Sequence, residues 1–321
     1  MQKFIIKLFI FSIPLIVLYN IPKITHYSFH NDIDKKINSL IESNIEPMII
    51  IGGDSRAERH VIPRILEKRF NFKTVNIGVN SGDIAILYNA LKNHDLTNPN
   101  STLIISVSSI EVNDSVINKW GIPHAYVTYM STFNCIKLFG SQYLNVMHER
   151  IPLIFDELFK IKANVKMGPS DSRLETNGFL GISGDISSYN FQEIDIFADT
   201  LKIGWYLNAK YDGIRKDVFN KLIKKIADTD MNVILFQPPV SPAWLMRTKN
   251  TYIDSAELDH SKFLKNISAQ YDNISFIDFY TSQSTVYHDS MYYNSVHFNY
   301  TGAEIFTNTL QDSLILRNLL K

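Results

Sequence analysis

A serine and a histidine that lie far apart in the sequence are the residues best suited to do chemistry. Ser55 lies in the segment GGDSRA (52–57), and His297 lies in the segment NSVHFNYTGA (294–303). A serine hydroxyl is a poor nucleophile until a neighbouring imidazole takes its proton. The pair therefore predicts nucleophilic attack on an acyl carbonyl, if the fold brings the two together. The alternative for the first segment is that Asp54 or Ser55 only caps a helix.

Two further segments could stabilise the oxyanion that such an attack creates. The segment NIGVNSGD (76–83) contains glycines that could present a backbone N–H, and EVND (111–114) contains an asparagine with a side-chain N–H. Pre-oriented N–H donors of both kinds stabilise tetrahedral intermediates. A turn or a helix cap would explain either segment equally well.

The elements that must position these segments alternate between strands and helices. Continuous apolar runs predict buried strands, and helical spacing of apolar residues predicts the segments between them. This alternation is typical of a mostly parallel sheet covered by helices on both faces. The carboxyl edge of such a sheet would bring Ser55 and His297 together. The predicted strands are 48–51, 72–77, 102–107, 232–236 and 274–277, and the predicted helices run through 62–66, 83–93, 216–227, 255–270 and 301–316.

Residues 114–212 break this alternation. They are rich in aromatic residues at helical spacing and then include a Gly/Ser stretch, 167–188, that predicts a loop. We interpret the segment as a helical insertion beside the sheet, with its aromatic side chains forming its own core.

The N-terminus has the pattern of an export signal. Lys3 and Lys7 precede an apolar run over 8–19, and no cleavage site of the Ala-x-Ala type follows it. An uncleaved signal anchor at 1–22 is therefore favoured over a cleaved signal. We expect a linker over 23–46 and an α/β domain over 47–321, outside the inner membrane of a bacterial cell, in the periplasm or at its surface.

Composition excludes several classes of protein. The chain has 321 residues, of which 45% are hydrophobic, so it is not a disordered tail. Lys+Arg and Asp+Glu both number 32, so there is no global basic field for nucleic acid. A lone cysteine, Cys135, excludes an internal disulfide and a multi-cysteine zinc site. The sequence has no phosphate-binding GxxxxGK motif and no HExxH motif, and no cofactor is expected.

The four segments, in this order and spacing over residues 48–315, resemble those of the SGNH/GDSL hydrolase family. The resemblance implies a flavodoxin-like three-layer sandwich. It also implies Ser55 as nucleophile and first oxyanion donor, Gly82 and Asn113 as the other donors, and His297 as general base. The final segment further resembles that of membrane-anchored bacterial members that act in the acylation of cell-surface polymers.

The chain departs from the family pattern at several positions. The residue three before the histidine is Asn294 instead of aspartate, so Asp289, eight residues before it, could orient the imidazole instead, or the protein could use a Ser–His dyad. Ser108 or Ser109 could replace Asn113 as a donor. One extra residue separates Gly78 from Gly82.

These observations predict an exported serine esterase or O-acyltransferase that acts on acyl esters, in particular acetyl esters, of cell-surface glycans. Arg56 could bind an anionic substrate or simply face solvent. The expected partners are the glycan or acyl donor, the membrane and a membrane-bound O-acyltransferase, with no nucleic acid. The alternative is a catalytically weak or inactive SGNH-like partner protein in cell-envelope polymer modification.

Overall fold

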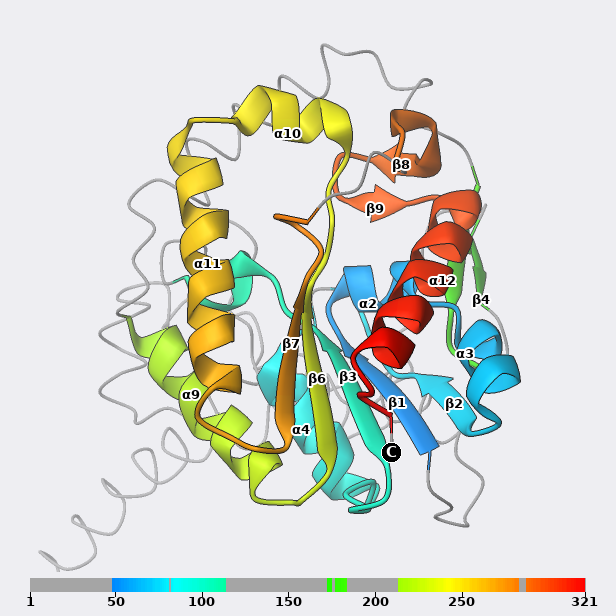
Figure 1. Cartoon of the computed structure of the whole chain (residues 1–321), viewed down its shortest axis with the longest axis vertical. Coiled ribbons are helices and arrows are strands. Elements are labelled where there is room, and N and C mark those ends of the chain that lie inside the picture. The colour runs from blue at the N-terminus through cyan, green and yellow to red at the C-terminus, as the bar shows by residue number, and fades with distance from the viewer. Residues whose placement is uncertain are drawn as a thin grey trace, which may run out of the picture. The chain divides into compact units, whose positions relative to one another are not determined.

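Five parallel strands form the central sheet of the computed structural model (Figure 1). Their order, β2-β1-β3-β6-β7, is the order of flavodoxin-like folds. The prediction of a mostly parallel sheet is confirmed, and each predicted strand lies at its expected place. The strands are β1 (Met48–Gly53), β2 (Lys73–Asn76), β3 (Thr102–Ser106), β6 (Asn232–Gln237) and β7 (Ile274–Asp278). The structure describes residues 48–80, 82–113, 172–174, 177–183, 213–282 and 287–320, all in one compact unit.

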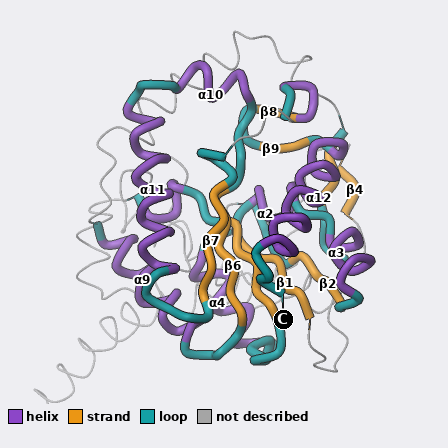
Figure 2. Tube along the Cα trace, viewed as in Figure 1, coloured by secondary structure: helices purple, strands orange, loops and turns teal. Residues whose placement is uncertain are grey.

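Helices cover both faces of this sheet (Figures 1 and 2), which explains why its strands are apolar along their whole length. Helices α2, α3 and α12 pack together over one face, where Ile49 and Ile51 join a core cluster with Phe306. Helices α4, α9 and α11 form the other layer. The six helices are α2 (Ser55–His60), α3 (Pro63–Phe70), α4 (Ile84–Asn93), α9 (Ile214–Ala227), α11 (Tyr252–Ser268) and α12 (Tyr300–Leu316).

The predicted helix that continues from Ser55 through residues 62–66 is in fact two helices. Val61 and Ile62 adopt extended backbone angles between α2 and α3. At Ile62 the cause is Pro63, which disfavours a helical conformation in the residue before it. Helix α2 is therefore short. Asn76, at the end of β2, stabilises the non-helical backbone between α2 and α3, because its buried amide nitrogen donates hydrogen bonds to the Ala57 and Val61 carbonyls.

Short elements cross the rim above the carboxyl edge of the sheet, where Figure 1 shows α10, β8 and β9. Strands β8 and β9 pair antiparallel, and their Tyr292 and Phe298 rings stack with centroids 4.3 Å apart. Phe298 also contacts Phe306 of α12 at 5.5 Å. This stack fixes the small hairpin to the core. The rim elements are η1 (Ser109–Val112), α10 (Pro242–Thr248), η4 (Asp289–Met291), β8 (Tyr292–Asn294) and β9 (His297–Phe298).

Most of the predicted N-terminal and inserted segments lie outside the described residues. The predictions for the signal anchor (1–22) and the linker (23–46) concern such residues, as does most of the prediction for the insertion (114–212). The loop predicted over 167–188 is wrong in part, because β4 (Ser172–Leu174) and β5 (Leu180–Ile182) form an antiparallel pair within it. The ring centroid of buried Phe179, beside β5, lies 5.9 Å from that of Tyr300 on α12.

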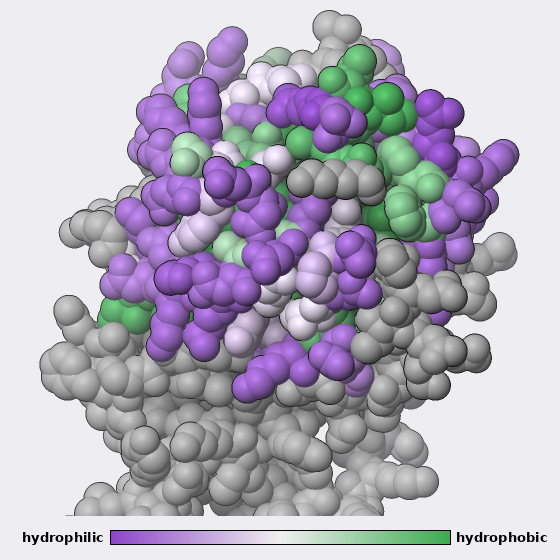
Figure 3. Space-filling view, turned by 60° about the horizontal axis from the view of Figure 1, so that its bottom comes forward, coloured by the Kyte–Doolittle hydropathy of each residue, from purple (hydrophilic) through white to green (hydrophobic). Residues whose placement is uncertain are grey.

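The outer surface of the described residues is mainly hydrophilic in the view of Figure 3, with a smaller hydrophobic area along one side. Exposed large hydrophobic side chains include Met246 on α10, Leu258 on α11 and Leu316 on α12. Single apolar side chains of this kind are normal on a surface that faces water. None of the helices in the described ranges combines the length and the apolar character that a membrane span requires.

Candidate active site

Ser55 is placed by a tight turn from β1 into α2. Gly53 has a φ of 123°, and a Cβ there would lie 2.4 Å from the Ser106 carbonyl oxygen, so only glycine fits beside β3. Asp54 then caps α2, since its carboxylate accepts a hydrogen bond from the Arg56 N–H at 2.9 Å. Ser55 is the first residue of α2 and lies at the carboxyl edge of the sheet. Capping by Asp54 and an accessible Ser55 are thus compatible features of one turn.

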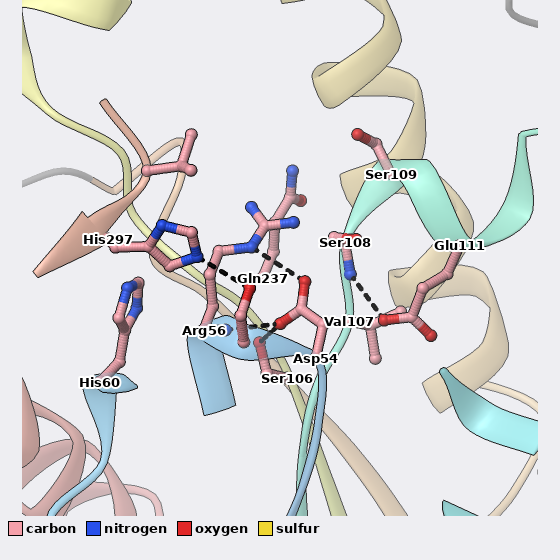
Figure 4. A network of polar contacts seen from close by, with 12 residues as sticks. Asp54, Arg56, His60, Ser106, Val107, Ser108, Ser109, Glu111, Gln237 and His297 are labelled. Carbon is pink, nitrogen blue, oxygen red and sulfur yellow. Dashed lines mark hydrogen bonds and ion pairs between the residues drawn. The ribbon is translucent and has the colours of Figure 1, made fainter. Parts of the chain in front are cut away.

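His297 reaches Ser55 from the other end of the chain. It lies on β9 of the rim hairpin (Figure 4). The Ser55 Oγ is 2.8 Å from the His297 Nε2. The two residues are 242 positions apart in the sequence. The structure therefore brings together the two residues that the sequence singled out, at the distance a proton transfer requires.

Asn294 orients the His297 imidazole. Its Oδ1 accepts three hydrogen bonds, from the Val296 N–H (3.1 Å), the His297 N–H (3.0 Å) and the His297 Nδ1 (3.1 Å). The two backbone donors fix the oxygen of the amide, not its nitrogen, toward the ring. The proton of the neutral imidazole is then on Nδ1, and the Nε2 lone pair faces the Ser55 hydroxyl. Asn294 thus supplies the orientation of a triad carboxylate without its charge.

Asp289 occupies a different position in the rim. Its carboxylate accepts a hydrogen bond from the Ala243 N–H at 2.9 Å, near the start of α10. Of the two candidates for orienting His297, Asn294 is therefore the one that contacts the ring. Asp289 instead ties η4 to α10.

The electrostatic surroundings keep the His297 imidazole neutral. Burial lowers its pKa well below the usual value, and the guanidinium groups of Arg59 and Arg56 lower it further. A neutral imidazole is the form that can accept a proton from Ser55. When the imidazole takes the proton from Ser55 it becomes positively charged. The Asn294 amide at its Nδ1 carries no negative charge and therefore stabilises this imidazolium less than a carboxylate would.

Arg56, a candidate for substrate binding, is an internal residue of the turn. Its Nε lies 3.1 Å from the Asp54 carboxylate, and both side chains are largely buried. The Ser106 hydroxyl approaches the same carboxylate at 3.4 Å. Figure 4 shows Arg56 beside His297, so its charge acts on the site while it helps to hold the turn in place.

Of the two further oxyanion candidates, Gly82 has its N–H engaged in a backbone hydrogen bond, and Asn113 is held by a side chain through its main-chain carbonyl. The Gly82 N–H donates to the Val79 carbonyl at 2.8 Å, and a Cβ at Gly82 would lie 2.5 Å from the Gly53 carbonyl oxygen. Gly82 therefore packs against the Ser55 turn, but its N–H would have to leave Val79 to meet an oxyanion. Asn113 is buried at the end of η1, where its carbonyl accepts a hydrogen bond from Arg215.

A buried polar network next to the site was not predicted from the sequence. The Ser109 hydroxyl donates to the Glu257 carboxylate at 2.6 Å, and the Gln237 side-chain amide donates to the other carboxylate oxygen at 2.8 Å. The network joins η1, β6 and α11, and Figure 4 shows Ser109 and Gln237 at the sheet edge. Glu257 lies in an ordinary helical pattern, so no local signal marks it. Its effect is to fix the loop after β3.

In the part of the chain that the structure describes, no group of three or more His, Cys, Asp or Glu side chains is placed to bind a metal ion.

No protein-family model matches the chain, and no curated protein matches it either. Several solved structures resemble it, and two of them are described here. A protein from Streptococcus pneumonia described as a platelet activating factor aligns with a TM-score of 0.44 and 11% identity, over 96% of this chain and 99% of that chain.

The second solved structure, from Bacteroides fragilis, is described as an acylhydrolase. It aligns with a TM-score of 0.44 and 12% identity, over 90% of this chain and 96% of that chain. At this TM-score neither likeness decides the activity of this chain. The function is therefore inferred from the geometry of the site.

The Asn76 side chain holds the end of α2 through buried hydrogen bonds, and its loss should have a measurable effect on stability. Replacing Asn76 by alanine is expected to lower the free energy of unfolding by about 3 kcal/mol, because the two carbonyls it binds and the Gly78 N–H lose their buried partner. Urea unfolding measures the change. Asn308→Ala, on the exposed face of α12, is the matched control and should change stability by less than about 0.5 kcal/mol. Equal losses in both variants would contradict this role of Asn76.

Proposed function

We propose that the protein is a serine ester hydrolase or O-acyltransferase of the SGNH type. The observation that carries the proposal is the 2.8 Å contact between the Ser55 Oγ and the His297 Nε2, with Asn294 on the opposite side of the ring. Nucleophile, base and orienting group are aligned in the order that acyl transfer requires. The position of Ser55 at the carboxyl edge of a parallel sheet agrees with where such folds place their sites.

The proposed reaction has two halves. The Ser55 oxygen attacks the acyl carbonyl while its proton moves to the His297 Nε2, and the leaving alcohol takes that proton as the tetrahedral intermediate collapses. The acyl group is then an ester of Ser55. Water, or a sugar hydroxyl in the case of transfer, attacks this ester and gives its proton to His297, which returns it to Ser55. The Ser55 N–H is the first proposed oxyanion donor, with Gly82 and Asn113 as further ones.

The proposed cellular setting is the outer side of the bacterial inner membrane. Its support is the apolar run over 8–19 with Lys3 and Lys7 before it. The proposed substrates are acyl esters of cell-surface glycans, and a membrane-bound O-acyltransferase is the proposed partner. The support for these is the resemblance of segment 294–303 to the polymer-acylating members of the family.

The proposal is tested by replacing the nucleophile. Ser55→Ala is expected to abolish turnover of p-nitrophenyl acetate and labelling by a fluorophosphonate, because the reactive oxygen is removed. Ser255→Ala, an exposed serine of α11, is the matched control and should leave both unchanged. Retained turnover in Ser55→Ala would show that the chemistry lies elsewhere.

A second candidate is a non-catalytic partner protein in polymer modification. The observation that favours it is the neutral Asn294, together with the two arginines that disfavour a charged His297. It predicts a wild-type protein that is inert toward activated esters and fluorophosphonates. Such a protein would still bind an acylated cell-surface polymer in a pull-down.

A further inference from the structure

A second histidine, His60, lies directly beneath the proposed catalytic pair. It is the last residue of α2, the helix that begins with Ser55, and it is fully buried. Figure 4 shows its ring below that of His297. The two ring centroids are 6.2 Å apart, with the rings edge to face, and the Phe298 centroid is 4.7 Å from that of His60. The sequence alone gave no reason to join it to the site.

The His60 ring forms a hydrogen bond with the backbone of β9, the strand that carries His297. The His60 Nε2 accepts a hydrogen bond from the Phe298 N–H at 3.2 Å. Strand β9 pairs with β8 along one edge only, so the N–H groups on its other edge need a partner. A buried N–H left without an acceptor costs about 1–3 kcal/mol. His60 thus takes the place of a neighbouring strand at the residue next to the base.

Helix α2 is itself fixed at this point by α12. The Thr307 hydroxyl lies 3.2 Å from the His60 carbonyl and 2.7 Å from the Ala303 carbonyl, and it accepts a hydrogen bond from the Ile62 N–H at 3.0 Å. The end of α2 therefore cannot shift without breaking contacts to α12. One short helix holds Ser55 at its start and the strand of His297 at its end.

The surroundings of His60 keep its acceptor nitrogen unprotonated. Burial lowers its pKa well below the usual value, the nearby His297, Arg56 and Arg59 lower it further, and the Val296 carbonyl offsets part of this. Because Nε2 accepts a hydrogen bond, the single ring proton is on Nδ1.

We propose that His60 is a positioning residue, which sets the distance between Ser55 and His297 through its hydrogen bond to the Phe298 N–H. The proposal rests on the proposed function, because it assigns His60 to the same Ser–His pair. Misplacement of reacting groups by about 1 Å can cost about 100-fold in rate. His60 touches neither the substrate nor the reacting oxygen, so its effect must pass through His297.

Three substitutions test the proposal by steady-state turnover of p-nitrophenyl acetate. His60→Leu keeps an apolar volume but removes the acceptor, and should lower kcat about 10- to 100-fold with little change in KM. His60→Gln places its oxygen close to the Nε2 position and should restore kcat to within about 3-fold of the wild type. His60→Asn is polar but too short to reach Phe298, and should behave like His60→Leu. If leucine serves as well as glutamine, or asparagine as well as glutamine, the proposal is overturned.

A background without the base separates positioning from general damage. In His297→Ala, the further change His60→Leu should not lower the residual rate, because no base remains to be positioned. A loss of the same size as in the wild-type background would overturn the proposal. Wild-type labelling by a fluorophosphonate is the separate arm for the proposed function. If the wild-type protein is not labelled, both the proposed Ser–His pair and the positioning role of His60 are wrong. If it is labelled, the comparisons among the His60 variants test the positioning role alone.

Discussion

His297→Ala is expected to reduce kcat for an activated acetyl ester roughly 10⁴-fold, one of the two largest effects in the site. Among the residues that the structure describes, the imidazole is the group that lies within hydrogen-bond distance of the Ser55 Oγ. Without it, the Ser55 hydroxyl must lose its proton to water, and the leaving alcohol gains no proton from the enzyme. KM should change little, because the ring acts on the reacting atoms.

The matched control for this variant is His288→Ala. His288 precedes η4 on the same rim and is exposed, so its loss should leave kcat within about 2-fold of the wild type. Stopped-flow release of p-nitrophenolate measures both variants. Similar rates in the two would mean that His297 does not act as the base.

Asn294→Ala is expected to lower kcat roughly 100-fold or more. It removes the oxygen that fixes the proton on the His297 Nδ1, and the wrong tautomer presents no lone pair to Ser55. Two backbone N–H groups lose the same acceptor, so stability should fall as well. Thermal unfolding separates that loss from the change in rate.

Asn294→Asp is expected to preserve the geometry and change the pH dependence. In the wild type, the lowered pKa of His297 leaves the base neutral in mild acid, so activity should fall only below the usual histidine pKa of about 6.5. A carboxylate in contact with the ring favours its charged form and raises its pKa. The acid limb of kcat/KM should therefore move up by about 1 pH unit or more, and kcat at neutral pH should rise.

Asp289→Asn is the control for this shift. It removes a negative charge from the other candidate, whose carboxylate contacts Ala243 and not the ring, so the acid limb should stay in place. If the limb moves in Asp289→Asn and not in Asn294→Asp, the assignment of Asn294 as the orienting residue is wrong.

The central sheet could be predicted from the sequence because its signal is local. Strands buried on both faces are apolar along their length, and the helices between them keep their spacing. The one error in this region came from a residue that overrides spacing, since Pro63 divides the predicted helix into α2 and α3.

The site could be predicted only in part, because contacts across the rim leave no local pattern. Ser55 and His297 were found through the segments that surround them. The choice between Asn294 and Asp289 depended on the β8–β9 hairpin, which turns Asn294 back onto the ring and sends Asp289 to α10. No local pattern marks His60, because its partner at the site is a backbone N–H, which the sequence does not display.

If Ser55 carries the acyl group, a reagent that reacts with activated serines should modify Ser55, and mapping the modified residue tests this. The wild-type protein is treated with a fluorophosphonate, digested, and analysed by tandem mass spectrometry. One adduct is expected, on the Ser55 side chain, and it should be lost in Ser55→Ala and strongly reduced in His297→Ala. An adduct on a different serine, or labelling of Ser55 that is unchanged in His297→Ala, would contradict this role of Ser55.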